Sequence, residues 1–108
     1  MTEVHALLQG QECNLALEGH ATGSREVCAA ISSIVYALAG YLANAEAAGN
    51  AQVQETLLEP GHVRIRCNGD DAAMGACGMA IHGLRQLAAQ YPEQVKIFFK
   101  KSSSSGRA

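Results

Sequence analysis

A long, almost uncharged helical segment constrains the fold of this chain more than any other feature of its sequence. Between residues 25 and 48, large apolar side chains recur at helical spacing and form one stripe, which consists of Val27, Ile31, Ile34, Val35, Leu38 and Leu42. The opposite side carries mainly alanine, serine and tyrosine. We therefore expect the helix to be covered on more than one side, by a sheet and by a second helix or a partner chain.

Both ends of this segment carry signals that bound a helix. Ser24 is a suitable N-cap, and Glu26 lies in the first turn, where the helix dipole favours a carboxylate. Gly49 and Asn50 follow the last helical position and are typical of a C-terminal stop. Gly40 lies inside the helix, where it costs stability unless another group packs closely against it.

Shorter segments with alternating apolar residues lie before and after this helix and predict strands. A second apolar helical pattern starts after Asp70 and Asp71 and stops before Pro92. The expected order is strand, strand, helix, strand, strand, helix, strand, over residues 4–8, 13–18, 25–48, 52–58, 62–67, 72–90 and 95–100. The predicted fold class is α+β, with a single mixed β-sheet of about five strands and two helices packed on it.

Length, charge and hydropathy restrict the remaining possibilities. The 108 residues suit one domain, which we expect to span residues 1–100, followed by a disordered tail at 101–108. The formal net charge of −2 provides no basic field to recruit nucleic acid. No signal peptide is recognisable, and the longest apolar run, residues 27–39, is too short to span a bilayer. We expect a cytoplasmic protein with reduced cysteines and with neither nucleic-acid nor membrane partners.

A histidine and a cysteine lie close together where a glycine-flanked loop meets the long helix. His20 lies in this loop, at residues 19–24, and Cys28 follows in the first turn of the helix. The amides and dipole of a helix N-terminus stabilise a thiolate, and a nearby histidine can accept the thiol proton or pair with the thiolate. Ser32 lies one turn later on the same side, where its hydroxyl can orient the thiolate or a bound group.

A structural interpretation of this pair is also open, because cysteine often serves as a small core residue and His20 can hydrogen-bond its own loop. The other chemistry-bearing residues favour such an interpretation more strongly. Three cysteines fall on inward faces, and three histidines have no partner at a recognisable spacing; these are Cys13, Cys67, Cys77, His5, His62 and His82. Because no close Cys/His pairs and no Gly-rich phosphate loop are present, we expect no metal and no cofactor.

Arg64 and Arg66 project from one face of a predicted strand. Such a pair can bind an acidic group, although solvated charges are the simpler interpretation.

Three short motifs resemble the ribosomal-processing cysteine protease family (Prp, or YsxB-like). They are Gly19-His20-Ala21, then Val27-Cys28-Ala29-Ala30, then Ser32. The resemblance extends over most of residues 3–100, and it includes the element order and segment 83–92, which looks like the family's closing helix and its Tyr-Pro stop. The combination of the two longer motifs is fairly specific, whereas either one alone would be weak.

The resemblance implies a homodimeric, cytoplasmic cysteine endopeptidase that removes a short N-terminal extension from a bacterial large-subunit ribosomal protein. By motif match, Cys28 is the nucleophile, His20 the base and Ser32 a supporting residue. It also implies that the loop between His20 and Cys28 covers the substrate, through Gly19, Ala21, Thr22, Gly23 and Ser24.

Two departures from the family pattern keep other hypotheses open. The loop is several residues shorter than is usual, and the position three residues before the cysteine, usually aspartate, is Arg25, with Glu26 beside it. Arg25 favours a thiolate and Glu26 opposes it. The second hypothesis is therefore a non-catalytic dimeric module of the same fold that binds a ribosomal or phage peptide. A third, a thiol redox sensor, requires a resolving cysteine near Cys28.

Overall fold

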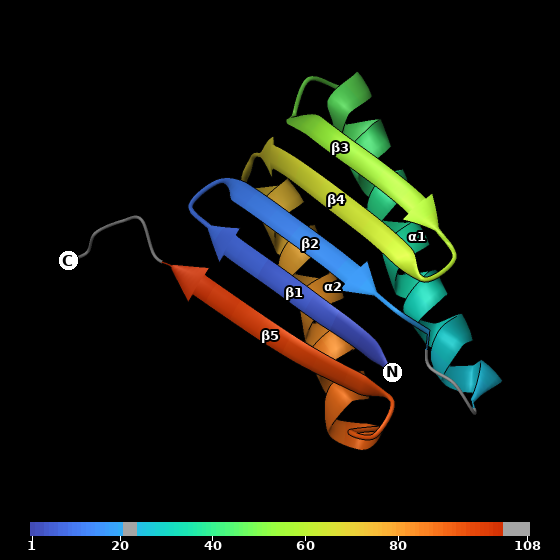
Figure 1. Ribbon diagram of the computed structural model, residues 1–108. Helices are drawn as coiled ribbons and strands as arrows, with labels where there is room; N and C mark the ends of the chain where they lie inside the picture. The colour runs from blue at the N-terminus through green and yellow to red at the C-terminus, as the bar shows by residue number, and fades with distance from the viewer. Residues whose placement is uncertain (21–23, 103–108) are drawn as a thin grey trace.

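The computed structural model describes residues 1–20 and 24–102 of the chain (Figure 1). The elements in chain order are β1 (Thr2–Gln9), β2 (Glu12–Glu18), α1 (Arg25–Ala47), β3 (Ala51–Glu59), β4 (His62–Gly69), α2 (Asp71–Gln90) and β5 (Val95–Ser102). This is the order that the sequence predicts, with boundaries that differ by one to two residues because strand pairing extends past the apolar cores of the segments.

The five strands form one mixed sheet in the order β3-β4-β2-β1-β5. Neighbouring strands are antiparallel except β1 and β5, which are parallel. Figure 1 shows α1 and α2 on the same face of the sheet, α1 toward the β3 edge and α2 toward the β5 side. The fold is therefore α+β with two layers, and within the described residues no helix covers the second face of the sheet.

The core lies between the sheet and the two helices. Alternate residues of the central strands, such as Val4, Leu15 and Ile65, are buried there, as period-two patterning requires. Each such side chain contributes roughly 1.5–3 kcal/mol of transfer free energy. From α1 the buried residues are Val27, Ile31, Val35, Leu38, Leu42 and Ala45. The predicted stripe is thus confirmed except for Ile34, which is half-buried at the edge of the core.

Both helices begin at the predicted caps. Ser24 Oγ accepts a hydrogen bond from the Val27 amide at 3.2 Å, and Asp70 Oδ1 accepts one from the Ala73 amide at 2.9 Å. Caps of this kind stabilise a helix by about 1 kcal/mol each. The Ser24 cap fixes the start of α1, and with it the position of the residues in its first two turns.

Two expectations about chain segments are corrected. β5 extends to Ser102, so Lys101 and Ser102 belong to a strand and not to the expected tail; residues 103–108 lie outside the described residues. The 23-residue helix α1 is long and apolar enough, by length and composition, to cross a membrane. The sequence-based length limit was wrong because it counted residues 27–39 alone. A core helix passes the same test, and the apolar stripe of α1 packs on the sheet.

Candidate active site

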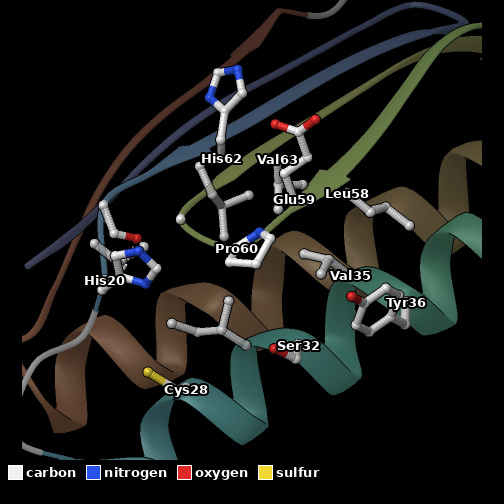
Figure 2. A pocket seen from close by; sticks show the side chains of 15 residues that line it. His20, Cys28, Ser32, Val35, Tyr36, Leu58, Glu59, Pro60, His62 and Val63 are labelled. Atoms are coloured by element: carbon white, nitrogen blue, oxygen red, sulfur yellow. Dashed lines mark hydrogen bonds between the residues drawn. The ribbon is translucent and has the colours of Figure 1, made fainter.

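A pocket of about 240 Å³ lies between the start of α1, the end of β2 and the turn that joins β3 to β4. His20, Cys28 and Ser32 all line it, so the fold brings together the three residues that the sequence singles out. Figure 2 shows His20 on the sheet side and Cys28 on the helix side of the same end of the pocket. The remaining wall is mainly apolar and is formed by Leu17, Ile31, Val35, Leu58, Pro60 and Val63.

His20 is positioned by the backbone that leads into it. The Gly19 amide donates to the Gly61 carbonyl at 2.9 Å, and Thr2 Oγ1 donates to the Gly19 carbonyl at 3.3 Å. Gly19 has φ +92, and a Cβ there would collide with the Met1 carbonyl oxygen. Only glycine meets both conditions at low cost, so this residue fixes the direction in which the chain leaves β2.

The β3–β4 turn supports the imidazole of His20 from behind. Gly61 has φ +72, and a Cβ at this position would collide with Nε2 of His20 and lie 2.8 Å from its Cε1. The ring therefore lies directly against the backbone of this turn. Because any side chain at Gly61 would push the ring away, the turn acts as a seat that sets the height of His20 above the sheet edge.

Cys28 is positioned by the first turn of α1. Its amide donates to the Ser24 carbonyl at 3.4 Å, and its half-buried side chain packs against the core on the pocket side. Ser32 follows one helical turn later and is exposed, and Tyr36 continues the same pocket wall with 57% of its surface exposed. This row places a thiol, a hydroxyl and a phenol along one wall of the pocket (Figure 2).

His62 is the second histidine near the pocket, and its ring has a different partner. Its Nδ1 lies 2.5 Å from Glu18 Oε2, in an ion pair on the sheet surface. Figure 2 shows the ring pointing away from Cys28. His62 thus contributes to the pocket wall while its imidazole points elsewhere, and His20 is the better-placed base.

The other three cysteines form a separate buried cluster between the sheet and α2. Cys13 and Cys67 are direct cross-strand partners, and Cys67 Sγ lies 3.9 Å from Cys77 Sγ. All three have no exposed surface. The hydrogen bond to Cys67 and burial raise the pKa of Cys13 to about 12. Hydrogen bonds to Cys13 and Cys67, with burial, raise the pKa of Cys77. The prediction that these cysteines belong to the core is confirmed.

Several predicted features lie at the edge of the description or outside it. Residues 21–23 of the predicted substrate loop lie outside the described residues, so Ala21, Thr22 and Gly23 have no described position. Arg25 and Glu26 are both exposed at the start of α1, and Ser24 Oγ donates to Glu26 Oε1 at 3.2 Å. Among the described residues, no group of three or more His, Cys, Asp or Glu side chains is arranged to hold a metal ion.

The sequence did not identify the β3–β4 turn, Thr2 or Tyr36 as part of the site. Pro60-Gly61 was recognisable as a turn, but its place beside His20 follows from the pairing of β2 with β4. These strands are separated in the chain by α1 and β3. No local pattern reports such a pairing, so the support of His20 could be found only in three dimensions.

Solved structures share this fold, whereas no protein-family model and no curated protein matches the sequence. The essential ribosomal processing protease Prp from S. aureus, in complex with a covalently linked product peptide, matches with TM-score 0.73 and 18% identity, over 93% of this chain and 100% of that chain. SMU.848 from Streptococcus mutans matches with TM-score 0.68 and 19% identity, over 94% and 95% of the two chains. The S. aureus protease with a substrate peptide matches with TM-score 0.67 and 16% identity, over 93% and 100%. The chain therefore has a Prp-like fold.

Proposed function

We propose that this chain is a cysteine endopeptidase of the Prp type, with Cys28 as nucleophile and His20 as general base. One observation carries the proposal: residues from two separate elements, the end of β2 and the first turn of α1, line the same end of one pocket. The fold also supports it, since structures that share it were crystallised with a substrate peptide and with a covalently linked product peptide.

The chemistry follows from these two side chains. His20 accepts the Cys28 thiol proton, and the thiolate attacks the carbonyl carbon of the scissile amide. When the tetrahedral intermediate collapses, His20 donates this proton to the leaving amine, which gives a thioester and a free amino terminus. His20 then takes a proton from a water molecule, the resulting hydroxide attacks the thioester, and the acid product leaves as the Cys28 thiol is restored. Ser32, one turn along α1, supports the thiolate or the bound peptide.

The substrate that we propose is the N-terminal extension of a bacterial large-subunit ribosomal protein. The apolar wall next to Cys28, with Leu58 and Val63 from the hairpin and Ile31 and Val35 from α1, suits an apolar side chain beside the scissile bond. The seat of His20 on the β3–β4 turn supports a role for this hairpin in holding the peptide.

We also propose that the protein is a cytoplasmic homodimer. The outer side of α1 supports a partner: Tyr36 and Tyr41 are 57% and 41% exposed, and a Cβ at Gly40 would meet open space. The close packing expected against Gly40 is therefore absent among the described residues, and a second copy can supply it. Sedimentation velocity tests this, with Tyr41→Lys expected to shift the dimer toward monomer and a purely monomeric wild type contradicting it.

The first experiment is the pH dependence of iodoacetamide alkylation at each cysteine, resolved by peptide mass spectrometry. We expect Cys28 to react fastest, and His20→Ala to slow its reaction at neutral pH by about tenfold or more. The matched control is His62→Ala, which removes a histidine from the same pocket whose ring points away from Cys28. Equal rates in wild type and His20→Ala would contradict the thiol–imidazole pair.

Peptide cleavage completes the test. Wild type and Cys28→Ala are incubated with peptides that span ribosomal-protein N-terminal extensions, and products are identified by mass. We expect cleavage by wild type alone. Peptide binding by both proteins without cleavage would replace the protease proposal with the non-catalytic peptide-binding module, for which the short loop and Arg25 are the sequence signals.

A further inference from the structure

The second face of the sheet carries a groove that is separate from the proposed active site. It has a volume of about 640 Å³, and its lining includes His5 and Phe98 on one side and Arg64 and Arg66 on the other. No helix covers it among the described residues, and Figure 1 shows this face of the sheet turned toward the viewer. The groove shares no lining residue with the pocket of Cys28.

Strand register explains the shape of the groove. One row across the sheet runs Arg64, Ala16, His5, Phe98, each residue paired with the next on the neighbouring strand. With strands about 4.8 Å apart, the β4 and β1 backbones are about 10 Å apart. Ala16 is the small residue between them, so it forms a floor, while Arg64 and His5 form the walls.

This spacing suits one planar ring between the two walls. His5 stacks on Phe98 with ring centroids 4.8 Å apart and planes inclined by 16°, so the imidazole is held upright and its other face is directed to the groove. Stacked rings lie about 4.5 Å or more apart. A flat ring placed over Ala16, between the His5 imidazole and the Arg64 guanidinium, therefore needs roughly the 10 Å that two strand spacings provide.

Charge along the groove favours an anionic occupant. The adjacent row runs Arg66, Asn14, Leu7, Lys100, so a cation lies at each end of it. The residues that line the groove thus include three cations, Arg64, Arg66 and Lys100, and no carboxylate. Glu55 lies outside the lining and approaches the two arginines at 4.0 and 3.8 Å, which holds both guanidinium groups in place and leaves a positive excess.

From these observations we infer that the open sheet face binds single-stranded nucleic acid, with a base between His5 and Arg64 and backbone phosphates on Arg66 and Lys100. A cationic groove combined with aromatic side chains is how sequence-tolerant single-strand binding works in general. An acidic peptide would satisfy the cations and leave the space beside His5 empty. The groove is open along the sheet, which suits a strand that passes through it better than a free nucleotide.

The net charge of −2 had argued against such a partner, and the reason for the difference is where the charges lie. The next row toward the proposed active site holds Glu59, His62, Glu18, Glu3 and Lys96, so carboxylates gather at that end of the face. The cations of the groove lie beyond them. We therefore expect the bound strand to approach from the Arg66 and Lys100 side and to avoid the acidic row.

Fluorescence anisotropy with a dye-labelled oligouridylate of about ten nucleotides tests this inference. We expect salt-dependent binding by wild type. The double variant Arg64→Gln/Arg66→Gln should bind at least about tenfold more weakly and reduce the log–log salt slope by about 1.4, or 0.7 for each lost phosphate contact. Arg25→Gln, with the same charge loss for one residue on the helix layer, should bind like wild type.

The stacking contribution has its own pair of variants. His5→Ala should weaken binding at least about fivefold while keeping the salt slope, and His5→Phe, which keeps a flat ring, should restore it. Circular dichroism melts establish that each variant is folded, and Lys100→Gln replaces the double variant if that protein is unstable. The inference is overturned by any of three results: no binding at low salt, wild-type affinity in the folded arginine variant, or equal affinity for an oligoglutamate of matched charge.

Discussion

Cys28 and the cluster of Cys13, Cys67 and Cys77 place the same side chain in two different surroundings. Cys28 is half-buried at the start of α1, on a pocket that His20 also lines. The cluster lies inside the core, where all three side chains have no exposed surface and face other apolar groups. A thiol reacts as an accessible thiolate, so position in the fold, and not residue type, distinguishes one candidate nucleophile from three packing residues.

The difference has a topological origin. Cys28 lies in the first turn of a helix, where the Ser24 cap holds the chain at the edge of the sheet. Cys13 and Cys67 are opposite each other on central strands, and Cys77 lies on the buried face of α2 above them. Variants that exchange reactivity or stability between the two environments test whether this division of roles is correct.

The largest effect is expected from removing each kind of cysteine in turn. Cys28→Ala should abolish peptide cleavage, a loss of at least about 10³-fold, because no other thiol lines the pocket among the described residues. Its free energy of unfolding should change little. Cys77→Ala should keep cleavage and lose about 1 kcal/mol of stability, because it leaves a void in the core. Cleavage rates and urea denaturation measure both, and the reverse pattern would refute the comparison.

The next effect separates the two histidines of the pocket. His20→Ala should lower kcat/KM by about 10²–10⁴-fold, which is the usual contribution of a general base. His62→Ala, whose ring faces Glu18, should change it only a few-fold. Steady-state kinetics with one peptide measures both variants. A larger loss in His62→Ala would move the base to the other face of the hairpin.

A smaller effect is expected from the glycine on which His20 rests. Gly61→Ala introduces a Cβ that collides with the imidazole, in addition to the left-handed backbone that Gly61 adopts at φ +72. Gly49→Ala has the same backbone penalty at φ +84 but meets open space. Both should lose about 1 kcal/mol of stability. Only Gly61→Ala should also lose activity, by about tenfold or more, since small displacements of catalytic groups are costly. Equal kinetics in the two variants would exclude the seat.

Much of the fold could be predicted because each element carries its own period. The α1 stripe, the inward positions of Cys13 and Cys67 and the caps at Ser24 and Asp70 are local patterns, and the structure contains them all. The strand order could not be read in the same way, because the pairing of β2 with β4 joins segments separated by a helix and a strand.

The two sites differ in the same respect. His20 and Cys28 are close in sequence, so their meeting in one pocket was predictable from a single loop and helix start. The groove on the open face combines residues from β1, β2, β4 and β5, and it becomes visible only when the register sets Arg64 and His5 on either side of Ala16. Net charge is a sum over the chain, and it conceals such local segregation.

The smallest effect concerns the buried cluster itself. The hydrogen bond to Cys67 and burial raise the pKa of Cys13 to about 12 in the folded protein. A raised pKa stabilises the fold below the pKa of the unfolded thiol, near 8.5, and this contribution is lost as the pH rises toward the folded value. From about pH 8 to pH 10, wild type should therefore lose on the order of 2 kcal/mol more than Cys13→Ala does, measured by urea denaturation at each pH. Parallel pH profiles for the two proteins would mean that Cys13 ionises inside the fold, and the contrast with Cys28 would then rest on access alone.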